Sequence, residues 1–216
     1  MSEKLGNNSI LLITSDLIYT ITALFADTFL VAYLLQITNE NITRVSIYYM
    51  IINAIHTIGS LIIGKFIKDE KYSKTKILSI GVMIRAIFIL FIVLLGTRLT
   101  NMFVLVAIFC GISETLYWST HEMIFVSITN NSNRKNYIST KKIFSTVVYI
   151  IAPIVLGSVI ELYSFIKIAI YVLVLSIIQI ILSMQIKIDK KSNEKRDPYS
   201  LKKYINSIKM KKNVFL

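Results

Sequence analysis

The sequence contains one cysteine, Cys110, among its 216 residues. A single cysteine excludes an intramolecular disulfide framework and a cysteine-based metal cluster. Because Cys110 lies inside an apolar run, we predict an inert packing residue. No other ligand cluster stands out in the sequence, so we expect no metal and no cofactor.

Proline, glycine and charge are also scarce. The chain has two prolines and seven glycines, and charged residues make up 17% of it, against about 25% in an average soluble domain. Hydrophobic residues reach 55%, which is more than a water-soluble core of this size hides. The composition therefore predicts an all-α membrane protein with long, uninterrupted apolar helices.

The apolar runs are long enough to cross a membrane. A hydrocarbon core about 30 Å thick requires roughly 20 residues at a rise of 1.5 Å each. Six runs of about this length, bounded by polar clusters, predict six transmembrane helices at residues 10–37, 45–67, 77–96, 102–128, 142–160 and 165–186. Together they predict a transmembrane bundle over residues 1–186.

The basic residues predict the orientation of these helices. Twenty of the 24 lysines and arginines lie at the start of the chain, in alternate connectors or after residue 186. The other connectors carry only Arg44, Arg98 and Lys167, and Arg85 lies within a span. The basic side is expected to be cytoplasmic, and an even number of spans places both termini there.

The net charge of +12 would also suit a nucleic-acid-binding protein. The basic residues lie almost wholly outside the apolar runs, which is typical of a membrane protein instead, so we predict the lipid bilayer as a partner and no nucleic acid. The abundance of isoleucine, lysine and asparagine indicates an A+T-rich bacterial coding sequence. We therefore expect a multi-pass protein of a bacterial plasma membrane.

Residues 187–216 form a basic, polar segment that is predicted to be a cytoplasmic tail. Apolar residues recur in it at helical spacing, with lysines between them: Leu201, Tyr204, Ile205 and Ile208. An amphipathic helix on the inner leaflet and a solvated linker are both compatible with this pattern. The last residues, 214–216, are also compatible with the start of a further span.

Two ionisable residues lie at similar depths in the first two predicted helices. Asp27 and His56 are candidates for substrate binding or proton coupling, because an intramembrane ionisable group normally faces a cavity or a partner. Consecutive helices are antiparallel, so the two side chains are able to face each other and share a proton. A polar contact that only fixes helix packing is the alternative.

A second pair lies in the third and fourth predicted helices. Arg85 and Glu114 are expected at comparable distances from the inner surface, where each neutralises the other. A structural ion pair is the first interpretation, since neither charge is tolerated alone at that depth. A Glu114 side chain that faces an open cavity would instead meet a proton or a cation.

Enzymatic motifs are incomplete in this chain. His121 and Glu122 begin a zinc-protease pattern, but that pattern needs a second histidine four residues after the first, where the chain has Phe125. There is also no Gly-x-Ser-x-Gly nucleophile pattern. We therefore predict a protein that is not an enzyme.

Three stretches match the motifs of one family. The connector from Gly64 to Leu78 contains glycine, then Asp69, then basic residues such as Lys74. The stretch from Gly111 to Arg134 leads from the fourth predicted helix toward the fifth, and the fifth contains Ala152-Pro153-Ile154-Val155-Leu156-Gly157. In these stretches the chain resembles the major facilitator superfamily, including its uncharacterised bacterial permeases. Gly64, Asp69 and Lys74 correspond to the family's signature loop, and Pro153 and Gly157 to its fifth-helix motif.

The resemblance implies the N-terminal half of a transporter that normally has twelve helices. Each half is a bundle of two three-helix repeats, and the halves rock about a substrate site between them. It implies secondary active transport of a small solute by alternating access, with a separate C-terminal half or a second copy as partner. It also implies that residues 187–216 are the linker between bundles. The alternative is a six-helix scaffold or partner subunit without transport of its own.

Overall fold

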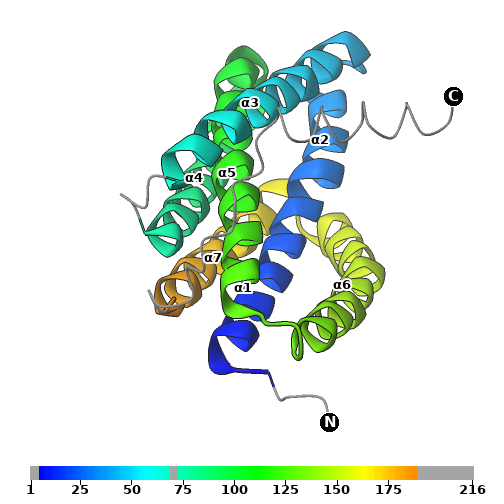
Figure 1. Cartoon of the computed structure of the whole chain (residues 1–216). Coiled ribbons are helices and arrows are strands. Elements are labelled where there is room, and N and C mark those ends of the chain that lie inside the picture. The colour runs from blue at the N-terminus through cyan, green and yellow to red at the C-terminus, as the bar shows by residue number, and fades with distance from the viewer. Residues whose placement is uncertain (1–4, 69–72, 189–216) are drawn as a thin grey trace, which may run out of the picture.

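The computed structural model describes residues 5–68 and 73–188, and all regular structure in this part of the chain is helical (Figure 1). Inside a hydrocarbon layer every backbone N–H and C=O group must be satisfied within the protein, and long apolar segments achieve this as helices. Asp69 of the expected signature loop and residues 189–216 of the expected tail lie outside the described residues.

The helices follow one another with short connections. In chain order they are α1 (Asn7–Leu24), the π-helix η1 (Phe25–Phe29), α2 (Leu30–Ile37), α3 (Ile42–Lys68), α4 (Lys74–Leu95), the 3-10 turn η2 (Gly96–Arg98), α5 (Leu99–Ile128), α6 (Arg134–Leu162) and α7 (Phe165–Gln185). The helix α6 begins before the apolar run at residues 142–160, so its first two turns carry the basic residues of the preceding connector.

Five helical stretches are long and apolar enough to cross a membrane. They are Asn7–Ile37, Ile42–Lys65, Lys74–Ile128, Arg134–Leu162 and Phe165–Gln185. The third of them has 55 residues and contains α4, η2 and α5. The chain is therefore a helical, multi-pass membrane protein.

The helices α4 and α5 form an antiparallel hairpin. Gly81 of α4 lies against Leu116 of α5, and Phe91, further along α4, packs on Phe109, nearer the start of α5. The turn between the helices begins at Gly96, which has a φ of +50°. Glycine adopts this left-handed conformation without the steric cost that a Cβ imposes, so it suits a turn this tight.

The first apolar stretch is a single helical rod with a π turn in its middle. The α-helical hydrogen bonds of α1 give way at Phe25–Phe29 and resume in α2. A π turn accommodates one residue more than an α turn, and such turns often occur at functional sites. Asp27 lies within this turn, which places an irregular segment of backbone at its position.

The bundle has a packed centre and two loosely packed sides. The helix α5 packs against α3 and α4, α7 packs against α4 and α1, and α6 packs mainly on α1. Figure 1 shows α3 and α6 on opposite sides of the α1 and α5 pair. Only 11% of the apolar window of α3 and 6% of that of α6 are buried, against 44% for the α4–α5 stretch. These two helices leave most of their surface uncovered by the bundle.

Candidate functional site

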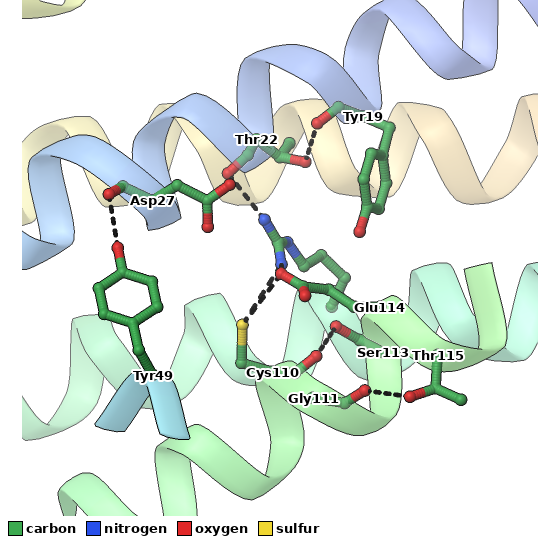
Figure 2. Close-up of polar contacts among 10 residues, drawn as sticks. Tyr19, Thr22, Asp27, Tyr49, Cys110, Gly111, Ser113, Glu114 and Thr115 are labelled. Atoms are coloured by element: carbon green, nitrogen blue, oxygen red, sulfur yellow. Dashed lines mark hydrogen bonds and ion pairs between the residues drawn. The ribbon is translucent and has the colours of Figure 1, made fainter. Parts of the chain in front are cut away.

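The guanidinium of Arg85 lies at the centre of the bundle with none of its surface exposed. Its terminal nitrogens donate to three groups: Nη1 to Glu114 Oε1 at 3.4 Å and to Cys110 Sγ at 3.5 Å, and Nη2 to the backbone carbonyl of Thr22 at 3.1 Å (Figure 2). These contacts join α4, α5 and α1. We call Thr22, Arg85, Cys110 and Glu114 the central cluster.

Glu114 neutralises Arg85 and still reaches the surface. The two side chains form an ion pair, in which Arg85 is fully buried and the Glu114 side chain is 19% exposed. The Cys110 thiol also donates to Glu114 Oε1, at 3.6 Å. Both contacts are made by the same carboxylate oxygen, Oε1, which holds Glu114 in place within the bundle. The rest of the carboxylate is left without these contacts, and part of the side chain is exposed.

Aromatic rings cover the cation on its other side. The Arg85 guanidinium lies 5.3 Å from the centroid of the Tyr19 ring and 5.4 Å from that of Phe88. Tyr19 in turn stacks on Tyr117, with ring centroids 3.7 Å apart. Such cation–π contacts partly replace the hydration that a buried guanidinium loses. The stacked rings join α1 to α5 beside the central cluster.

Asp27 lies at the exposed edge of this region. Its residue is exposed, and its backbone carbonyl accepts a hydrogen bond of 2.7 Å from the Tyr49 hydroxyl of α3. Its carboxylate forms no hydrogen bond or ion pair with any described residue. Figure 2 shows Asp27 one helical turn beyond Thr22, whose carbonyl belongs to the central cluster. The carboxylate of Asp27 therefore lies near the Arg85–Glu114 ion pair without a direct contact to a described residue.

His56 does not meet Asp27 in the structure. It is half-buried on α3, and its Nδ1 is buried without a hydrogen-bond partner among the described residues. Within residues 5–68 and 73–188, no hydrogen bond or ion pair joins it to Asp27. The α3 residue that reaches the π turn is Tyr49 instead.

The family-motif residues lie away from the central cluster. A Cβ at Gly64 would meet nothing within 4 Å, and one at Gly157 would meet only the Phe29 ring, at 4.0 Å. Lys74 Nζ donates to Ser127 Oγ at 3.2 Å, which links the start of α4 to the end of α5. Pro153 lies within α6, which remains helical through it.

One ionisable residue that the sequence interpretation did not select is Asp16. It is 1% exposed and forms an ion pair with Lys141 of α6, with Oδ2 and Nζ 3.1 Å apart. An aspartate inside the first apolar run is itself a signal, because a charge at that depth is costly without a partner. The identity of the partner, 125 positions away in the chain, is not contained in any local pattern.

The helical fold and the buried charge cluster define a multi-pass membrane protein with a polar centre. The family model described as Major Facilitator Superfamily matches residues 9–214. The chain therefore belongs to the major facilitator superfamily, whose members are transporters of small solutes rather than enzymes. No curated protein and no solved structure matches the chain.

Proposed function

We propose that the chain forms one bundle of a secondary active transporter that moves a small solute by alternating access. The observation that carries this proposal is the central cluster: a buried Arg85–Glu114 ion pair whose carboxylate stays partly open, next to the unpartnered carboxylate of Asp27. Charges inside a membrane are retained where they face a substrate or ion pathway. Family membership supports the same function.

The proposed bundle has six spans. At 1.5 Å per residue, a stretch of 55 residues would be about 80 Å long, far more than a hydrocarbon core of about 30 Å. The antiparallel contacts of α4 and α5 support two crossings within it. Asn7–Ile37, α3, α4, α5, α6 and α7 then make six, and the basic connectors favour cytoplasmic termini in a bacterial plasma membrane.

The proposed partner is a second six-helix bundle, either a separate C-terminal half or a second copy of this chain. The support is a polar stripe on α3, where exposed polar residues recur at spacings of seven and four, which places them on one face of the helix: Ser46, Asn53 and Thr57. Polar side chains on a membrane helix normally face another helix or a water-filled cavity rather than lipid. A facing bundle would turn this surface into one wall of a substrate cavity.

Within this cavity three residues are candidates for contact with the solute or the coupling ion. Asp27 is the candidate for direct contact with the solute or the coupling ion, because the residue is exposed and its carboxylate has no hydrogen bond or ion pair with a described residue. Glu114 is the candidate that exchanges Arg85 for a ligand during the cycle, because Arg85 and the ligand compete for the same carboxylate. His56, whose Nδ1 has no hydrogen-bond partner among the described residues, is the third candidate, on the α3 side.

The test is solute-evoked proton flux in proteoliposomes that contain the full chain, alone or with any adjacent C-terminal half. Trapped pyranine reports the flux on addition of sugars, amino acids or organic cations. We expect Asp27→Asn and Glu114→Gln to reduce the flux at least tenfold, whereas Thr28→Val, a change of the exposed neighbour in the same π turn, leaves it unchanged. Wild-type flux in both carboxyl variants would remove the assigned roles. Absence of flux in every configuration would favour a scaffold without transport.

A further inference from the structure

A second group of charged side chains lies one to two turns from the central cluster, where α1, α5 and α6 meet. It consists of Asp16 of α1, His121 and Glu122 of α5, and Lys141 of α6, which we call the Asp16 cluster. Asp16 Oδ2 lies 3.1 Å from Lys141 Nζ, and Asp16 Oδ1 accepts a hydrogen bond of 3.2 Å from the Tyr117 hydroxyl. The proposed transport mechanism does not use this cluster.

The imidazole of His121 lies between two carboxylates. Its Nε2 is 3.4 Å from Asp16 Oδ1, and its Nδ1 is 3.5 Å from Glu122 Oε1. The ring is 1% exposed, and neither nitrogen has an aligned hydrogen-bond partner among the described residues. A neutral imidazole donates from only one nitrogen, so the other would direct its lone pair at a carboxylate oxygen. Only the imidazolium is able to donate to both.

The formal charge of the Asp16 cluster leads to the same conclusion. Two carboxylates and one ammonium give a net charge of −1 when His121 is neutral, and one added proton makes the cluster neutral. The buried carboxylate of Asp16 is already paired with Lys141, so the charge that a proton on His121 would compensate is that of the mostly exposed Glu122. Within the cluster, the base that lies between the two carboxylates is His121.

We propose that His121 is a proton-binding site, at which the bound proton forms an imidazolium that bridges Asp16 and Glu122. Glu122 provides access to it, because its side chain is 63% exposed and lies six residues, about 9 Å, from the end of α5. A proton that reaches Glu122 from solvent is one contact away from the imidazole.

The other titratable groups around His121 do not supply the missing charge. On α5 itself, the Tyr117 ring stacks on the imidazole, with centroids 5.6 Å apart. From α6, Tyr137 has a buried hydroxyl without a described partner, and Lys141 is committed to Asp16. From α1, Tyr19 packs on Tyr117. From the described residues of α3 and α4, no charged side chain reaches ion-pair distance of the ring.

Proton binding at this site changes how α6 is attached. With neutral His121, Lys141 is the only cation among the described residues that contacts Asp16, and it connects α6 to α1. With the imidazolium present, Asp16 is shared between two cations and its hold on Lys141 weakens. Since α6 is otherwise the least buried helix, protonation would free it to move. The use of this movement in coupling rests on the proposed transport function, whereas the proton site does not.

The test is a pH titration of the full chain, labelled with ¹⁵N-histidine, in detergent micelles. The sequence contains only two histidines, so His56→Gln leaves the ring signals of His121 alone. We expect both ring nitrogens to reach imidazolium shifts when the pH is lowered, because histidine is the side chain that readily gains a proton. Asp16→Asn and Glu122→Gln should each lower the proton affinity about tenfold, which is one pH unit at the titration midpoint.

Glu122→Gln is the decisive variant because the exposed Glu122 side chain contributes little to folding. Lys141→Met should raise the proton affinity, since it removes a cation that competes for Asp16. Equal midpoints in the wild type, Asp16→Asn and Glu122→Gln would overturn the proposal, as would a His121 ring that stays neutral throughout the titration. None of these outcomes depends on a transport assay, so failure of the proton site and failure of the transport proposal are distinguishable.

Discussion

Gly81 of α4 lies directly against the backbone of Tyr117 in α5. A Cβ at position 81 would stand 3.0 Å from the Tyr117 nitrogen and 2.9 Å from the Cβ of the neighbouring Leu116. Backbone atoms cannot rotate away as a flexible side chain does, so the two helices would have to separate. This contact allows the central hairpin to close tightly enough for Arg85 to reach Glu114.

We therefore expect Gly81→Ala to destabilise the bundle by about 1–3 kcal/mol, the usual cost of overpacking a well-packed core. Thermal unfolding in detergent measures the effect. Gly64→Ala is the matched control, since a Cβ there meets nothing within 4 Å. Equal melting temperatures for the two variants would show that α4 and α5 accommodate a methyl group at position 81 without separating.

The Arg85–Glu114 pair should behave as one energetic unit. Arg85→Met leaves Glu114 without its cation, and we expect a loss of about 3 kcal/mol, which is typical of a broken buried pair. Adding Glu114→Gln should recover part of this loss because no unpaired charge then remains. Denaturant unfolding of the two single variants and the double variant measures the coupling. Strict additivity would mean that the 3.4 Å contact contributes no coupling energy.

Two adjacent lysines in α6 allow a matched comparison. Lys141 contacts Asp16, whereas Lys142 is exposed and has no described partner. We expect Lys141→Met to cost about 2 kcal/mol, less than a fully buried pair because Lys141 is one-quarter exposed. Hydrogen exchange should accelerate in α6 but not in α4. An identical exchange pattern for Lys142→Met would show that the Asp16 contact does not hold α6.

The hydroxyl of Tyr49 should stabilise the π turn. It donates to the backbone carbonyl of Asp27 at 2.7 Å, and Tyr49→Phe removes only this donor. We expect a loss of about 1 kcal/mol and faster amide exchange at Phe25–Phe29. Tyr171→Phe is a suitable control, because Tyr171 is 61% exposed. Unchanged exchange in the Tyr49 variant would indicate that the turn is held by packing alone.

Much of the helical architecture is readable from the sequence because it follows from length and hydropathy. The runs at residues 45–67, 77–96 and 165–186 correspond to α3, α4 and α7, and the resemblance to the major facilitator superfamily is confirmed by the family match over residues 9–214. The count of six spans and the orientation of the termini stay predictions. Helix ends are less predictable, since α6 continues through the basic residues that precede its apolar run.

The side-chain partnerships were harder to predict. Asp27 and His56 have compatible depths, but depth alone does not fix the direction in which a helix presents a residue. The ion pair of Asp16 with Lys141 depends on α6 packing against α1, which is a tertiary property. Local patterns identify which polar residues need partners, whereas the packing of distant helices decides which partners they find.

The π turn at Phe25–Phe29 also changes the angular phase of the first helical rod. An extra residue in one turn rotates everything after it by about 100° relative to an uninterrupted α-helix. A helical wheel drawn for residues 10–37 as one helix would therefore assign the wrong face to one of its halves. A cysteine accessibility scan along Asn7–Ile37 should show two separate periodic patterns, offset from each other at Asp27.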